Sequence, residues 1–194
     1  MKMAPAALAF PTGCPHTGPE FAYVLGALLA EGHASLSQPP ATGFFAPQGV
    51  AWAPSEHIRH LSRSSRPLVT ALGLPRFLLG LRFGRHRGPS RGFEGVRHRY
   101  LAALDAGATA GRFTPPREPA PPDPVARRVD ILSMWSRTTV DLTSAILRWP
   151  DAALDRYQLP HPVLGLLSVR DMLAFTVYHT AHHLRRIMER DAHA

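Results

Sequence analysis

Residues 168–187, which read SVRDMLAFTVYHTAHHLRRI, decide the fold because a helix start precedes a long run of helical periodicity. Ser168 and Asp171 form an S-x-x-D pattern that is typical of a helix N-terminus. Apolar residues and histidines then recur every three or four positions, which is the spacing of one helix face. The pattern predicts a helix from residue 168 to about residue 190. Its expected inward positions are Met172, Phe175 or Thr176, His179, His183 and Ile187.

Three other long segments carry the same periodicity, and each has a start signal of its own. Thr17 and Glu20 form a T-x-x-E capping box. Pro54 occupies a first helical position, and Asp123 stands before Pro124 as an N-cap. The three predicted helices cover residues 19–37, 54–72 and 124–149.

The remaining sequence reads as connections. Residues 74–122 are rich in proline, glycine and arginine, and within them only residues 92–106 have the pattern of a short helix. The loop 150–167 shows no strand alternation, and neither does any other segment. Pro67 is expected to kink the second helix because it removes a backbone donor. Four long amphipathic helices with a Pro/Arg-rich crossover between the second and third predict an all-α four-helix bundle.

Length and composition favour a single domain. The chain has 194 residues, 45% of them hydrophobic, which is enough for one core without a disulfide or a structural metal. We expect a flexible segment at 1–16 and one domain at 17–194. The single cysteine, Cys14, excludes an intramolecular disulfide and favours the cytoplasm, and we expect neither a signal peptide nor a membrane span.

Positive charge is concentrated in one part of the chain. The net charge is +8, but residues 59–99 hold ten arginines and one acidic residue, Glu94, which leaves +9 on this stretch. Such a patch can attract a polyanion. Because no nucleic-acid motif accompanies it, we expect a solvated loop or an anionic-ligand site rather than specific nucleic-acid binding. Arg63 and Arg66 are expected to be solvated rather than to bind a substrate carboxylate.

Eleven histidines are present, and two of them have the spacing of metal ligands. His179 and His183 are four residues apart, so they differ by about 40° around a helix and by about 6 Å along it. This H-x-x-x-H spacing lets two imidazoles reach one metal ion, although hydrogen-bonded core histidines have the same spacing. His182 is a rival on the same helix. A third ligand from a facing helix is either His60 or His57.

The same residues resemble a known family. Residues 52–61 (WAPSEHIRHL) look like the W-S-x-x-E-x-x-x-H-L helix start of the DinB/YfiT-like superfamily of metal-dependent proteins, with alanine at 53 where the family has Ser or Thr. Residues 161–187 resemble its P-x-x-G-x-x-S/T and H-x-x-x-H helix, and 100–107 resemble its loop before the third helix. The resemblance implies a four-helix bundle, often dimeric, with a three-histidine metal site. By position, its ligands are His60, His179 and His183.

A three-histidine site leaves a coordination position open for chemistry. Zn²⁺ suits imidazole ligands, and so does Ni²⁺. The ion activates either a bound water or a thiol. The resemblance favours a thiol transferase that uses a low-molecular-weight thiol, with a related hydrolase or isomerase as the alternative. Candidates for acid–base work are Glu56, His57, Tyr178 and His182, although Glu56 fits a helix-start role equally well.

A second hypothesis comes from a different class of protein. In it the chain is a non-catalytic binding or stress-response protein, whose metal is absent or structural. The arginines of 59–99 then recruit an anionic partner. Metal content and the salt dependence of polyanion binding discriminate between the two hypotheses.

Overall fold

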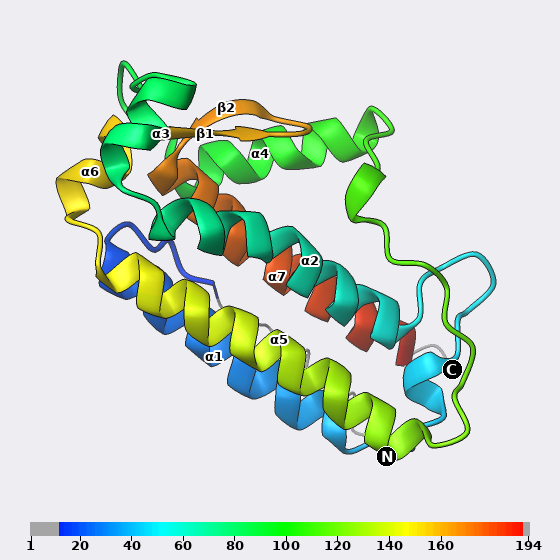
Figure 1. Cartoon of the computed structure of the whole chain (residues 1–194). Coiled ribbons are helices and arrows are strands. Elements are labelled where there is room, and N and C mark those ends of the chain that lie inside the picture. Colours follow the sequence, from blue (N-terminus) through cyan, green and yellow to red (C-terminus); the bar gives the residue numbers. More distant parts are fainter. Residues whose placement is uncertain (1–11, 192–194) are drawn as a thin grey trace, which may run out of the picture.

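The computed structural model describes residues 12–191, with side chains described up to residue 189. Most of the predicted flexible segment 1–16 therefore lies outside the described residues. Four long helices form a bundle, as predicted (Figure 1). They are α1 (Gly18–Ser37), α2 (Pro54–Gly73), α5 (Pro124–Leu147) and α7 (Val169–Asp191).

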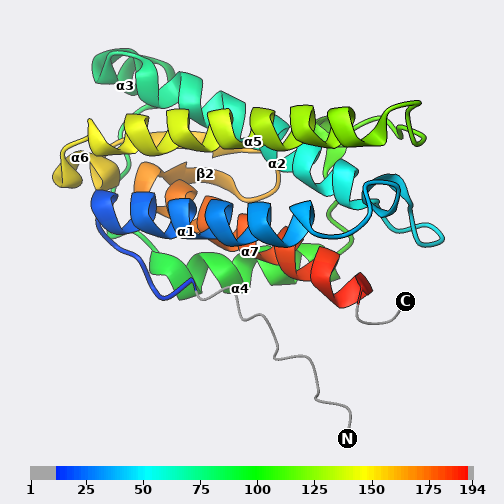
Figure 2. The ribbon, with the colours of Figure 1, turned by 90° about the horizontal axis from the view of Figure 1, so that it is seen from below.

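Helices α1 and α2 occupy separate corners of the bundle. Each of them packs against both α5 and α7 (Figures 1 and 2). The long predicted crossover connects α2 to α5. Helix α4 (Gly92–Asp105) lies within that crossover and covers the outer side of α7. The layout leaves α2 and α7 side by side, running in opposite directions (Figure 1).

The predicted start signals of α1 and α5 form the hydrogen bonds expected of helix N-caps. The Thr17 hydroxyl accepts the backbone N–H of Glu20, whose carboxylate accepts the N–H of Thr17 in return. The Asp123 carboxylate accepts the N–H of Ala126. Helix α2 has half of a capping box, because Glu56 accepts the N–H of Ala53 at 2.7 Å and alanine has no side-chain oxygen to reciprocate.

The core is continuous from one end of the bundle to the other. Packing is tight at Gly32 on α1, where an added Cβ would lie 2.8 Å from the side chains of Trp135 and Leu184. Only glycine fits there without displacing a side chain. The largest fully buried apolar side chains are Phe21, Leu28, Ile58, Leu61, Leu79, Leu142, Ile146, Leu154, Leu167, Leu173, Leu184 and Ile187.

The structure corrects three expectations about the connections. The stretch after residue 74 contains a helix, α3 (Arg76–Phe83), and the loop 150–167 contains α6 (Asp151–Arg156) and a β-hairpin. The prediction that no segment forms a strand was therefore wrong, although the hairpin is a minor part of an all-α fold. Each of these elements is too short to show a hydrophobic period, and the two short helices bury one side chain each, Leu79 on α3 and Leu154 on α6.

The hairpin joins strands β1 (Gln158–His161) and β2 (Gly165–Ser168) in antiparallel register. Gln158 pairs with Ser168, and His161 pairs with Gly165. Gly165 has a φ of +74°, a left-handed conformation that glycine adopts without strain. The hairpin packs on α7 and places His161 against Phe175 in the N-terminal half of that helix.

A buried arginine fixes the start of α7. Arg170 is 2% exposed, and its guanidinium donates to the carboxylates of Asp151 and Asp155 and to the backbone carbonyl of His16. These bonds tie α7 to α6 and to the segment before α1. Buried charge requires such full pairing. None of the helices in the described part of the chain combines the length and apolar character of a membrane span.

Candidate metal centre

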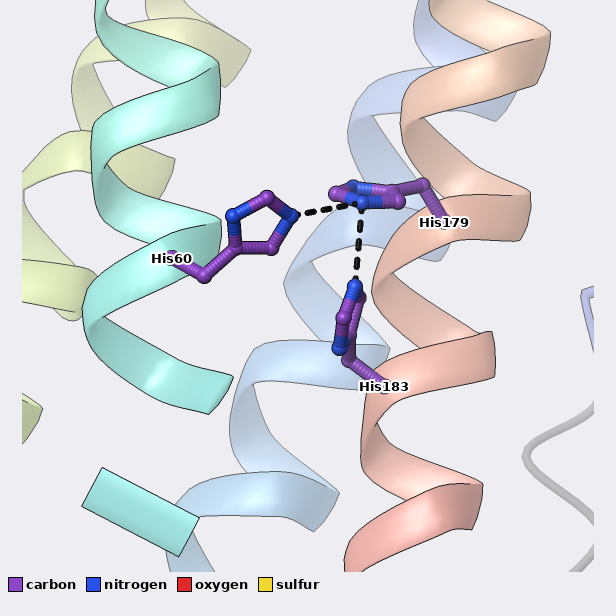
Figure 3. Close-up of side chains that lie close together, drawn as sticks. All are labelled: His60, His179 and His183. Carbon is purple, nitrogen blue, oxygen red and sulfur yellow. Dashed lines mark hydrogen bonds between the residues drawn. The ribbon is translucent and has the colours of Figure 1, made fainter. Parts of the chain in front are cut away.

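Three buried histidines meet between α2 and α7 (Figure 3). The Nε2 atom of His179 lies 3.0 Å from Nε2 of His60 and 3.1 Å from Nε2 of His183. The three side chains are 4%, 6% and 8% exposed. Each offers one ring nitrogen, and these nitrogens all lie within 4.8 Å of one another.

Helix geometry accounts for the convergence. His179 and His183 are one turn apart, so both imidazoles leave α7 on the same face. His60 leaves α2 from the face that packs against α7, and its ring points at the pair (Figure 3). Rigid packing of two helices therefore fixes all three donors before any ligand binds.

The outer nitrogens of two rings are held by neighbours. The Nδ1 atom of His60 donates to the backbone carbonyl of Phe113 at 3.1 Å. The Nδ1 atom of His183 lies 2.7 Å from Nδ1 of His57, and the ring of Trp52 stacks on His183. Metal-ligating histidines characteristically use the second nitrogen in this way, because it fixes the tautomer and turns Nε2 toward the ion.

Proton counting shows why a cation fits. Burial lowers the pKa of His60 and holds the pKa values of His179 and His183 well below the ordinary range, so all three rings are neutral near pH 7. Since His60 donates through Nδ1, its Nε2 carries only a lone pair. When His183 likewise donates to His57, two lone pairs face the single Nε2 of His179.

The spacing of the nitrogens is compatible with a small cation. Two nitrogens bound at about 2.0 Å to a tetrahedral Zn²⁺ lie about 3.3 Å apart. The two measured separations, 3.0 and 3.1 Å, are close to this value. The donor set thus suits Zn²⁺ or Ni²⁺ rather than a cation that prefers oxygen ligands.

The four acid–base candidates occupy different environments. His57 contacts His183 and lines the cavity beside it, as does His182. Glu56 is buried at the start of α2 and accepts a backbone N–H there, which is the helix-start role. Tyr178 is buried among the rings of Phe93, Tyr100 and His182.

The cysteine and the two arginines considered in the sequence analysis lie away from the cavity. Cys14 is exposed before α1, and it does not line the cavity beside the histidines. Arg63 and Arg66 are exposed on α2, where the guanidinium of Arg63 donates to the carbonyl of Arg112. Neither arginine lines the cavity, so the expectation of solvated positions is confirmed.

His161 is a site residue for which the sequence analysis gave no role. Its Nδ1 accepts the backbone N–H groups of Val163 and Leu164, so the proton of the neutral ring is on Nε2. Burial lowers its pKa to about 4. The ring packs edge-on against Phe175, which stacks on His179. The signal in the sequence was only a histidine before a proline in a predicted loop.

A cavity of about 640 Å³ opens beside the three histidines. Its size lies within the range of small-molecule sites. The segments 50–52, 108–114 and 159–163 contribute to its walls, together with one face each of α2 and α7. Tyr100 on α4 also lines it, and burial raises the pKa of this phenol to about 12.

Comparison with known proteins places the fold in a family. The model of the DinB superfamily matches residues 27–187, which include all three histidines. The chain belongs to the DinB superfamily. The matched region also contains all the described residues that line the cavity. No curated protein matches the chain.

A solved structure shares the DinB fold. It is described as YfiT from Bacillus subtilis, a probable metal-dependent hydrolase with an unusual four-helix bundle topology. The similarity has a TM-score of 0.59 at 16% sequence identity, and it covers 89% of this chain and 84% of that one. The comparison therefore shows that the two proteins share the four-helix bundle fold.

Proposed function

We propose that this DinB protein is a metal-dependent enzyme whose ion is held by His60, His179 and His183. The observation that carries the proposal is the convergence of three buried, neutral Nε2 atoms with outer nitrogens held by Phe113 and His57. Zn²⁺ is the preferred ion, with Ni²⁺ as the alternative. A bound ion would supply Lewis acidity and lower the pKa of an attached water or thiol.

The residues around the triad have roles that follow from their positions. His57 orients His183, and the Phe113 carbonyl orients His60. The stacked Trp52 ring shields His183 from bulk water. His182 lines the cavity next to the triad, and burial lowers its pKa, so it is a neutral imidazole able to accept a proton near pH 7.

Two reactions suit this arrangement. In the first, a low-molecular-weight thiol gives its proton to a base such as His182, and the thiolate sulfur forms a bond to an electrophilic carbon as the leaving group on that carbon departs with its bonding electrons and takes up a proton. In the second, a water is activated for hydrolysis, which is the reaction class named for YfiT. We favour the thiol transferase, acting on a small-molecule substrate in the cytoplasm as a homodimer.

Elemental analysis of untagged protein tests the metal assignment. We expect about one Zn²⁺ or Ni²⁺ per chain, and loss of that metal in His60→Ala and in His183→Ala. Far-UV circular dichroism checks that both variants fold. His33→Ala, which removes an exposed histidine on α1, is the matched control and should keep its metal. Full occupancy in both folded ligand variants would overturn the assignment.

A screen of thiols with electrophiles then separates the two reactions. Turnover that requires both the metal and an added thiol supports the transferase. Turnover of an ester or amide without any thiol supports the hydrolase. Activity that persists in folded His60→Ala protein would contradict a metal-dependent mechanism of either kind.

A second candidate function rests on the surface of α3. Phe77 and Leu81 are 63% and 80% exposed on this helix. Exposed arginines 82, 85 and 87 follow, and none of them forms an ion pair with another described residue. An apolar face with unneutralised positive charge suits an anionic partner, as a binding or stress-response protein would require.

Binding to heparin at increasing salt tests this second function. Replacing arginines 82, 85 and 87 by serine should weaken binding at least tenfold at low salt and flatten its salt dependence. Replacing exposed arginines 137, 148 and 186 by serine changes the net charge equally and should have a smaller effect. Equal effects of the two triple variants would mean that only the net charge matters.

A further inference from the structure

The cavity continues well beyond the histidines. On α2 its wall runs from His60 through Ser64 and Leu68 to Ala71, and the eleven helical rises between these ends span about 16 Å. On α7 the wall runs from His179 back to Met172. Because α2 and α7 are antiparallel, these two walls extend in the same direction from the metal centre (Figure 1). The cavity is therefore an elongated channel with the three histidines near one end.

The far part of this channel behaves as an apolar surface. Leu68, Ala71, Phe83 and Met172 line it. Hydroxyls also line the channel, from Ser64, Ser65, Tyr100, Thr109, Thr114 and Thr176. On the two helices that form its long walls, Ser64 donates to the Leu61 carbonyl and Thr176 to the Met172 carbonyl. A hydroxyl that is satisfied by its own backbone offers little to a ligand.

Charge is almost absent from the channel. Among the described residues that line it, Arg112 is the one with a permanent charge, and its side chain is exposed on the 108–114 segment. No described carboxylate lines it. An ionic group buried beside Leu68 or Ala71 would lose its hydration without gaining a partner. The polar groups of a ligand thus belong near the histidines, and its apolar part belongs beyond them.

We infer that the substrate of this DinB protein is an amphipathic molecule with a metal-binding polar head and an uncharged apolar tail. The tail lies between α2 and α7 and reaches toward Ala71 and Phe83. A tail in this channel exchanges water for apolar side chains, so each buried methylene improves affinity about fourfold. The inference rests on the proposed function only for the position of the head.

A series of alkyl hydroxamates tests the inference, because the head group binds Zn²⁺ while the tail length varies. The butano-, hexano-, octano- and decanohydroxamates are titrated calorimetrically into zinc-loaded and metal-free protein. We expect each two-carbon step to tighten binding by about fifteenfold until the channel is full. Metal-free protein should bind every member more weakly but keep the same dependence on chain length.

Variants locate the tail. Ala71→Leu fills the far end, so the gain with chain length should stop at a shorter hydroxamate, while the butano compound is unaffected. Ser65→Leu narrows the channel nearer its middle and serves as a second variant if Ala71→Leu fails to fold. Thr70→Leu adds similar bulk at a neighbouring exposed position and should leave the whole series unchanged.

The outcomes separate this inference from the proposed function. Affinity that does not rise with chain length would overturn the inference, as would a rise that Ala71→Leu and Ser65→Leu both leave unaltered. Equal affinities with and without zinc, combined with a rise that Ala71→Leu cuts short, would support the apolar tail site and overturn the proposed metal-bound head.

Discussion

His161 should make the stability of the protein sensitive to mild acid. Its Nδ1 accepts two backbone N–H groups inside the hairpin, so protonating that atom would break both bonds and place a charge in a partly buried site. Burial lowers its pKa from 6.5 to about 4. The unfolded chain therefore binds a proton in a pH range where the folded chain does not.

The sign and size of the effect follow from linkage. Because the pKa is lower in the folded state, the stabilisation is complete above about pH 6.5 and is lost progressively as the pH falls toward 4. For one group with these two pKa values, the loss between pH 7 and pH 5 is about 2 kcal/mol. This is a substantial share of the stability of an ordinary domain.

The assay compares urea unfolding of metal-free wild type and His161→Asn at pH 7 and pH 5. Asparagine does not titrate, and its side-chain oxygen can keep accepting the N–H groups of the hairpin. We expect the variant to lose about 2 kcal/mol less than wild type between the two pH values. His98→Asn, at an exposed position on α4, controls for removing a histidine. The same pH dependence in His161→Asn and wild type would refute the reasoning.

Three further predictions concern the helix start, the buried arginine and the metal centre. Ala53→Ser supplies the missing half of the capping box and should stabilise the protein by about 1 kcal/mol, which thermal unfolding would show as a rise of about 2–4 °C. Arg170→Met should cost about 3 kcal/mol near pH 7 in urea unfolding. Because Arg170 lowers the pKa of Asp155, that contribution is present above about pH 4 and is lost at lower pH, so the two proteins should converge in acid. His57→Phe removes the partner of His183 and should weaken Zn²⁺ binding by about 10- to 100-fold in a chelator competition while one ion per chain still binds; unchanged affinity would contradict a positioning role.

The long helices were predictable because their signals are local. The capping box at Thr17 and Glu20, the N-cap at Asp123 and the proline at 54 all act within one helical turn, so the sequence alone places the helix starts. Their ends agree with the structure to within about two residues. The hairpin and α3 escaped prediction because segments of four to eight residues carry no measurable period and are defined by what they pack against.

In the candidate site, too, only the features that depend on local sequence were predictable. The spacing of His179 and His183 follows from the helical period, so the sequence alone determined that these imidazoles share a face. The choice between His57 and His60, and between His182 and His183, could not be made locally, because each alternative lies close to its rival on the same helix. The packing of α2 on α7 brings His60 and His183 to His179 and leaves His57 behind His183.

The sequence by itself therefore determined the long helices, the family resemblance and the set of histidines that are candidate metal ligands. Only the tertiary structure decided which three Nε2 atoms converge, that His161 faces the cavity with a fixed tautomer, and that an apolar channel continues toward Ala71. The physical reason is the distance along the chain over which each kind of interaction acts. Caps and periodicity act over a few residues, whereas a metal centre and its channel depend on how helices more than 100 residues apart pack together.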